Sequence, residues 1–95
     1  SDYRLKEDLK EFNGLDIASK IKMYDFKWKS DDSRSYGVMA HELQEIFPQA
    51  VSGDKDEKNE NGKAIYQGVD YSKLVPVLLK SIQELEQRIK ELENK

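Results

Sequence analysis

The most regular hydrophobic pattern of the chain lies in its last quarter. One series of apolar residues recurs every seven positions, and a second series follows it three residues later. These are the a and d positions of consecutive heptads, a pattern that predicts a helix packed along other helices. The six positions are Val75, Leu78, Ile82, Leu85, Ile89 and Leu92. We therefore predict a coiled-coil helix over residues 71–95, joined to a body formed by residues 1–70 within one structural domain.

The residues beside this seam qualify the prediction. Arg88 occupies a g position and Glu93 an e position, so Arg88 is placed to pair with Glu93 of a neighbouring helix. Valine or isoleucine at a with leucine at d favours parallel dimers, and the heptads alone do not fix the number of helices. Pro76 predicts an irregular first turn, because a proline there removes a backbone N–H donor.

The first part of the chain carries shorter patterns. Leu5, Leu9 and Phe12 stand four and three residues apart, which predicts a charged amphipathic helix from Ser1 to Phe12. Asn13-Gly14 is interpreted as its stop signal, followed by one or two further helical turns between Leu15 and Ile21.

Strand patterns follow in the middle of the chain. Tyr24, Phe26 and Trp28 alternate with polar residues, which predicts a strand that buries its aromatic face. A second strand or extended segment is expected over residues 36–40, and a helix over residues 41–47 that ends at Pro48.

A long polar stretch separates the last predicted strands. Between Gly53 and Lys63 there is no apolar residue, and Asn61-Gly62 is a turn dipeptide before an alternating segment. We predict a β-hairpin with a solvated tip. A calcium loop is disfavoured because lysines interrupt the acidic run and the required glycine is absent. The fold class is therefore α+β: short helices and a small antiparallel sheet or hairpin before a long C-terminal helix.

Composition narrows the possible functions. The 95 residues carry 16 Lys and Arg against 19 Asp and Glu, a net charge of -3, and no basic patch predicts a nucleic-acid partner. There is no cysteine, and the single His41 cannot build a zinc site alone, so we expect no metal and no cofactor. No apolar run approaches the roughly 20 residues of a transmembrane helix, and no membrane partner is predicted.

Four blocks of the sequence resemble a known family. Ser1–Lys6 is similar to the S-D-x-R-L-K opening of the intramolecular chaperone domain at the C-terminus of bacteriophage tail spikes and tail fibres, of the auto-cleaving endosialidase type. Phe26–Lys29, Gly37–Pro48 and Gly68–Leu74 agree with further blocks of that family in the same order. His41 departs from the glutamine usual at its position, which leaves the expected fold unchanged.

The resemblance implies a function for the whole chain. It implies a homotrimer, with the C-terminal helix in a trimeric coiled coil, that aligns the upstream fibre or spike domain of the same polypeptide for folding. Self-cleavage next to Ser1 would then release the chaperone from the mature fibre, after assembly in the host cytoplasm. Because trimerisation at one end raises the effective concentration of the upstream strands, this sequence of events is physically coherent.

The resemblance also implies a serine-lysine pair, Ser1 as nucleophile and Lys6 as base, acting once rather than in repeated turnover. A lysine accepts the serine proton only in its neutral form, which burial or neighbouring cations such as Arg4 and Lys10 would favour. Residues five apart do not share a helical face, so either Ser1 precedes the helix or the pair meets across subunits. The bond cut is the one before Ser1 or, alternatively, the one between Ser1 and Asp2.

Two other functions are compatible with the same sequence patterns. The first is a structural trimerisation module that does not cleave. The second is the related chaperone region of membrane-bound transcription factors of the myelin regulatory type. Expression with upstream sequence separates the first from a self-cleaving chaperone, because a module that does not cleave would leave the polypeptide intact.

Overall fold

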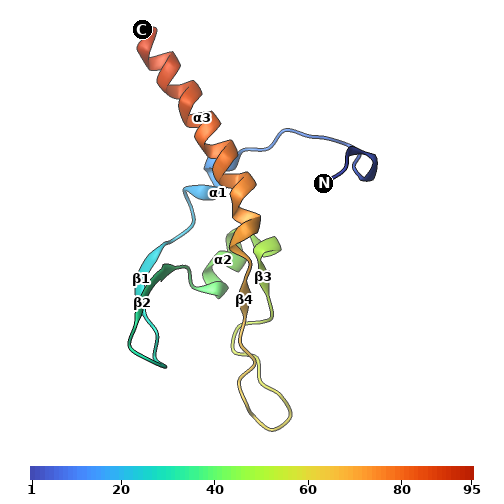
Figure 1. Ribbon diagram of the computed structural model, residues 1–95, viewed down its shortest axis with the longest axis vertical. Helices are drawn as coiled ribbons and strands as arrows, with labels where there is room; N and C mark the ends of the chain where they lie inside the picture. The colour runs from blue at the N-terminus through green and yellow to red at the C-terminus, as the bar shows by residue number, and fades with distance from the viewer.

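The computed structural model describes residues 1–95, and helix α3 (Val75–Glu93) forms one end of it. The molecule measures 60 × 37 × 21 Å, with two hairpins below α3 and the N-terminal segment leaving to one side (Figure 1). Short helices and two separate two-stranded antiparallel sheets precede the long helix. The predicted α+β class is confirmed.

The start of α3 is irregular, as Pro76 predicts. A 3-10 turn, η3 (Tyr71–Leu74), leads into α3, and the proline lies in the first turn of the α-helix where its missing N–H costs least. Asp70 caps η3, because its carboxylate accepts hydrogen bonds from the backbone N–H and the hydroxyl of Ser72. These donors hold the pKa of Asp70 below its ordinary value.

The first hairpin pairs β1 (Tyr24–Lys27) with β2 (Arg34–Gly37), with Tyr24 opposite Gly37 and Lys27 opposite Arg34. The predicted first strand is confirmed. The predicted burial of its aromatic face is only partly right: Phe26 is half-buried, whereas Trp28 remains 52% exposed and contacts Phe26 edge to face at 4.9 Å. A single chain supplies too few elements to cover both rings.

Helix α2 (Ala40–Ile46) follows the first hairpin and ends before η2 (Pro48–Ala50), which confirms the helix expected near residues 41–47. Strands β3 (Val51–Ser52) and β4 (Gly68–Val69) then pair antiparallel. The chain between them forms the long lower loop of Figure 1, with an isolated bridge between Lys58 and Ala64. The solvated hairpin tip is therefore confirmed.

The core of the chain is small. Four buried apolar residues form it, and Ile21, Phe47, Val51 and Val69 pack against them. The four are Val38, Leu43, Ala50 and Leu74. A core of this size stabilises a 95-residue chain poorly by itself, and association with further copies is a common remedy.

Candidate functional site

Residues 1–12, here called the N-terminal arm, contain the predicted serine-lysine pair and are not the expected helix. Only η1 (Tyr3–Leu5) forms, as one 3-10 turn. Asp8 adopts a left-handed backbone conformation with φ of 55°, which no right-handed helix contains. The prediction of a helix from Ser1 to Phe12 is wrong, because no surface of the same chain covers Leu5 and Leu9.

Asp2 and Arg4 organise the start of the arm. The Asp2 carboxylate caps η1 by accepting the backbone N–H of Arg4 at 2.8 Å. It also accepts two bonds from the Arg4 guanidinium, at 3.0 and 2.8 Å. These bonds lower the pKa of Asp2 and raise the pKa of Arg4. Arg4 is thus paired with a carboxylate close to the predicted nucleophile.

The predicted catalytic pair is not assembled in the single chain. Ser1 and Lys6 are both exposed, and no hydrogen bond joins their side chains. The cations expected to assist Lys6 are engaged elsewhere, since Arg4 binds Asp2 and Lys10 lies 3.5 Å from Asp8. The arm by itself therefore does not bury Lys6.

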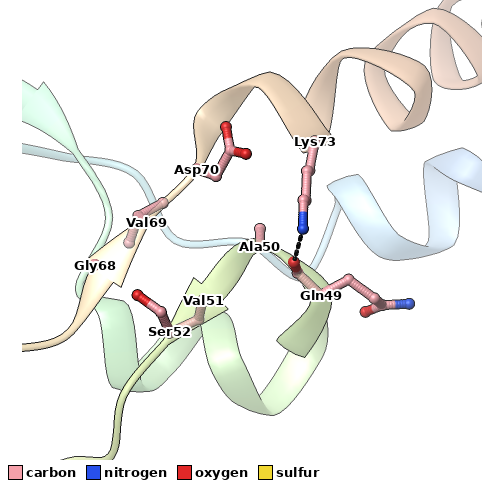
Figure 2. Close-up of a pocket in the computed structure, with 8 residues that line it drawn as sticks. All are labelled: Gln49, Ala50, Val51, Ser52, Gly68, Val69, Asp70 and Lys73. Atoms are coloured by element: carbon pink, nitrogen blue, oxygen red, sulfur yellow. Dashed lines mark hydrogen bonds between the residues drawn. The ribbon is translucent and has the colours of Figure 1, made fainter.

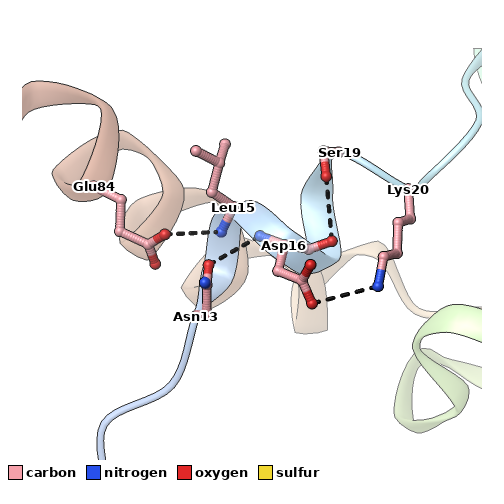
Figure 3. Close-up of polar contacts among 6 residues, drawn as sticks. All are labelled: Asn13, Leu15, Asp16, Ser19, Lys20 and Glu84. Carbon is pink, nitrogen blue, oxygen red and sulfur yellow. Dashed lines mark hydrogen bonds and ion pairs between the residues drawn. The ribbon is translucent and has the colours of Figure 1, made fainter. Parts of the chain in front are cut away.

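The base of the arm is fastened to α3 through α1 (Gly14–Ala18). Asn13 caps α1 by accepting the N–H of Asp16, so Asn13-Gly14 starts a helix where the sequence suggested a stop (Figure 3). Glu84 of α3 accepts the N–H groups of Gly14 at 2.7 Å and Leu15 at 3.3 Å. A carboxylate at a helix N-terminus is favourable both as an acceptor and against the helix dipole.

Lys80 adds a second attachment. Its ammonium group binds the Glu11 carboxylate at 2.7 Å and lies 5.9 Å from the centre of the Phe12 ring. The ion pair lowers the pKa of Glu11 and raises the pKa of Lys80. Sequence patterns missed Glu84 and Lys80, because their partners lie about 70 positions away in the chain.

Gly14 allows α1 to approach α3 closely. A Cβ atom at this position would lie 2.7 Å from the Val77 carbonyl oxygen and 2.8 Å from Lys80 Cβ. We expect Gly14→Ala to lower the free energy of unfolding by about 1–3 kcal/mol, because backbone atoms cannot yield to the added methyl group. Urea denaturation at one fixed protein concentration measures this change.

Gly68→Ala is the matched control. The nearest atom to its added Cβ is the flexible Ser52 hydroxyl at 2.9 Å, so stability should change little. Equal losses for both variants would mean that the α1–α3 contact does not depend on Gly14.

The predicted heptad seam lies exposed along α3. Its six side chains are between 45% exposed at Leu85 and 65% exposed at Leu92. Helix α1 packs instead on the other side of α3, over Val77 and Ser81, which are buried. The chain thus covers a part of α3 that carries no a or d residue, and it leaves the seam uncovered.

Leu79 widens the seam, a feature that the a and d positions alone do not include. It follows Leu78 at an e position and is also exposed. The stripe is three positions wide only in this first heptad, because the later e positions are Glu86 and Glu93. Arg88 and Glu93, the pair expected to bridge helices, form no ion pair within the chain, whereas Glu86 binds Lys90 on the same helix.

The single chain exposes more surface than a typical compact monomer of the same mass. Its accessible surface is 8237 Å², against about 5,700 Å² expected for a folded monomer of 11.1 kDa. Its radius of gyration is 17.8 Å, against about 12 Å for a compact domain of this length. The excess of roughly 2,600 Å² per chain is of the size that obligate assemblies bury.

Two concave sites lie away from the arm. A cavity of about 270 Å³ lies beside the β3–β4 pair, where Lys73 donates to the Gln49 carbonyl oxygen at 3.0 Å (Figure 2). A second cavity, of about 330 Å³, lies between the first hairpin and the start of α3 and is mostly apolar. Neither contains Ser1 or Lys6.

No group of three or more His, Cys, Asp or Glu side chains is arranged to hold a metal ion. None of the helices combines the length and the apolar character that crossing a bilayer requires.

Comparison with known proteins assigns the family. The family model described as "Chaperone of endosialidase", which belongs to a class of peptidases, matches residues 1–52, just over half of the chain. A crystal structure described as that of "a novel intramolecular chaperon" shares the fold, with a TM-score of 0.62 over 93% of this chain and 99% of the other at 18% identity. No curated protein sequence matches at a significant level. The chain belongs to the chaperone-of-endosialidase family and is an intramolecular chaperone of the endosialidase type.

Proposed function

We propose that the chain trimerises through α3, aligns the upstream tail spike or tail fibre chain of the same polypeptide, and then releases itself by one cleavage next to Ser1. The observation that carries the proposal is the exposed seam of α3, on the side of the helix that α1 leaves free. A parallel arrangement brings the three seams together with all upstream chains at the same end. The assembly takes place in the host cytoplasm, and the released chaperone is absent from the mature fibre.

The choice of three chains rests on the width of the stripe. Two-stranded coiled coils bury mainly the a and d positions, whereas Leu79 adds an apolar e position next to Leu78. Ser81 at g is small and already buried by α1, so the wide side of the stripe faces away from α1. The valine-isoleucine and leucine pattern at a and d points towards dimers, and Glu86 and Glu93 keep the later e positions polar. The proposal therefore rests the third chain on the first heptad, where Leu79 is exposed.

Cleavage in the proposal uses the Ser1 hydroxyl as nucleophile and neutral Lys6 as the base. Both side chains are exposed in the single chain, so the proposal places their assembly in the trimer, where a neighbouring subunit excludes water. A non-cleaving trimerisation module is the second candidate, favoured by the separation of Ser1 from Lys6 in this structure. The two differ in whether upstream sequence is removed.

Sedimentation equilibrium tests the assembly. We expect the mass to be three times 11.1 kDa at micromolar concentration, because each chain leaves roughly 2,600 Å² of surplus surface to bury. A monomer mass at that concentration would contradict the proposal, and a dimer mass would contradict the role given to Leu79.

A further inference from the structure

The N-terminal arm has no partner elsewhere in its own chain before Glu11, which pairs with Lys80. Tyr3, Leu5 and Leu9 are between 83% and 87% exposed. The backbone of residues 7–11 forms no backbone hydrogen bond with the rest of the chain. The arm therefore has both side chains and main-chain groups available for a surface that a single chain does not provide.

A surface of matching chemistry lies on the body. The cavity of about 330 Å³ between the first hairpin and the start of α3, here called the aromatic groove, is lined by nine residues of which seven are hydrophobic. Phe26, Trp28 and Tyr71 line it, and Trp28 remains half exposed. Tyr71 lies in η3, four residues before Val75 at the start of α3.

The arm does not lie over the groove of its own chain. Figure 1 shows the arm leaving α3 on the side opposite to β1 and β2. Its base is held on α3 by Glu84, which accepts the N–H groups of Gly14 and Leu15, and by Lys80, which pairs with Glu11. The same chain's groove is therefore not the partner of the arm in this structure.

A groove on a neighbouring subunit is within reach. Leu5 lies nine residues before Gly14, and nine extended residues span up to about 30 Å. The base of the arm lies six to ten residues along the helix from Tyr71, which is about 9–15 Å of axial distance. Adjacent helices in a bundle are about 8–10 Å apart, so the arm is long enough to cross to the next subunit and descend to its groove.

We propose that the arm of each subunit docks Tyr3 and Leu5 in the aromatic groove of the next subunit. This inference rests on the proposed trimer. It accounts for part of the surplus surface, which exceeds the roughly 800 Å² that one partner buries in a standard interface. It also places Ser1 and Lys6 against a neighbouring body, where apolar side chains exclude water and favour the neutral lysine that a base requires.

Disulfide trapping tests the contact, because the chain contains no cysteine of its own. Leu5→Cys combined with Ser35→Cys places one thiol on the arm and one in the groove, and Ser35 is a lining residue. Mild oxidation should link chains covalently into dimers and trimers on a non-reducing gel. Leu5→Cys with Ser30→Cys is the matched control, since Ser30 lies in the turn of the same hairpin, outside the groove, and should give little linkage.

Trp28 provides an independent readout, because it is the only tryptophan. Docking should shield its indole from acrylamide, and Tyr3→Ser with Leu5→Ser should remove that protection while the trimer mass is retained. A trimer without Leu5–Ser35 linkage and with unchanged Trp28 quenching would overturn the docking and leave the proposed trimer standing. A monomer mass with no linkage between chains would overturn both.

Discussion

Replacing Ile82 and Ile89 together with aspartate should dissociate the proposed trimer into monomers at micromolar concentration. Both side chains lie in the exposed seam of α3, and the trimer would bury several carboxylates with no cation opposite them. An unpaired buried charge costs several kcal/mol even after the structure relaxes, which exceeds the contribution of any single seam residue. Sedimentation equilibrium should show the mass falling from three chains to one.

The control uses the same helix and the same substituted residue. Gln83 and Gln87 are exposed and lie outside the seam, so Gln83→Asp with Gln87→Asp should leave the mass unchanged. If both double variants remain trimeric, the subunits associate through another surface.

Ser1→Ala should abolish self-cleavage when the chain is expressed with its natural upstream sequence, while the trimer remains intact. The substitution removes the proposed nucleophile from an exposed position that contributes nothing to the core. Lys6→Ala should slow cleavage by about 100- to 10,000-fold, the usual contribution of a general base. Denaturing gels taken over a time course measure the intact and cleaved fractions.

Lys6→Arg separates proton transfer from electrostatic assistance. Arginine keeps the positive charge but remains protonated, so it cannot accept the serine proton and should be as defective as alanine. Lys10→Arg is the control on the same arm and should cleave at the normal rate. Normal cleavage by Ser1→Ala or Lys6→Arg would refute the catalytic pair and favour a trimerisation module processed by another peptidase.

The elements defined by local patterns were predictable from the sequence. The period of seven residues predicted α3, and Pro76 predicted the irregular start of that helix. The alternation of aromatic and polar residues predicted β1. The polar run before Asn61-Gly62 predicted the solvated loop. In each case the deciding interactions are between residues close in sequence, and local propensity agrees with the final structure.

The arm was not predictable in the same way. Leu5, Leu9 and Phe12 have helical spacing, but an isolated helix of this length is marginal in water and needs a surface to bury its apolar face. The single chain offers none, and Asp8 breaks the helical geometry. Ser1 and Lys6 could be named from the family resemblance, whereas their relative position depends on contacts that no local pattern encodes.

The α1–α3 contact illustrates a second limit. Asparagine before glycine is compatible with both the end and the start of a helix, since asparagine serves turns and N-caps alike. Glu84 resolves the ambiguity by accepting the N–H groups of Gly14 and Leu15. That acceptor lies 70 positions from Gly14, so only the folded chain reveals it.

The attachment of α1 to α3 also determines where the N-terminal arm leaves the helix. The junction is at the level of Val77 to Glu84, part of the way along α3 and on its outer side, rather than at the end of the helix. In a parallel trimer, three equivalent junctions stand at one height around the bundle. Because the three arms would be equivalent, the nascent strands that precede Ser1 in the proposed trimer would begin with no axial offset between them, which would give a fibre of intertwined chains a common starting plane.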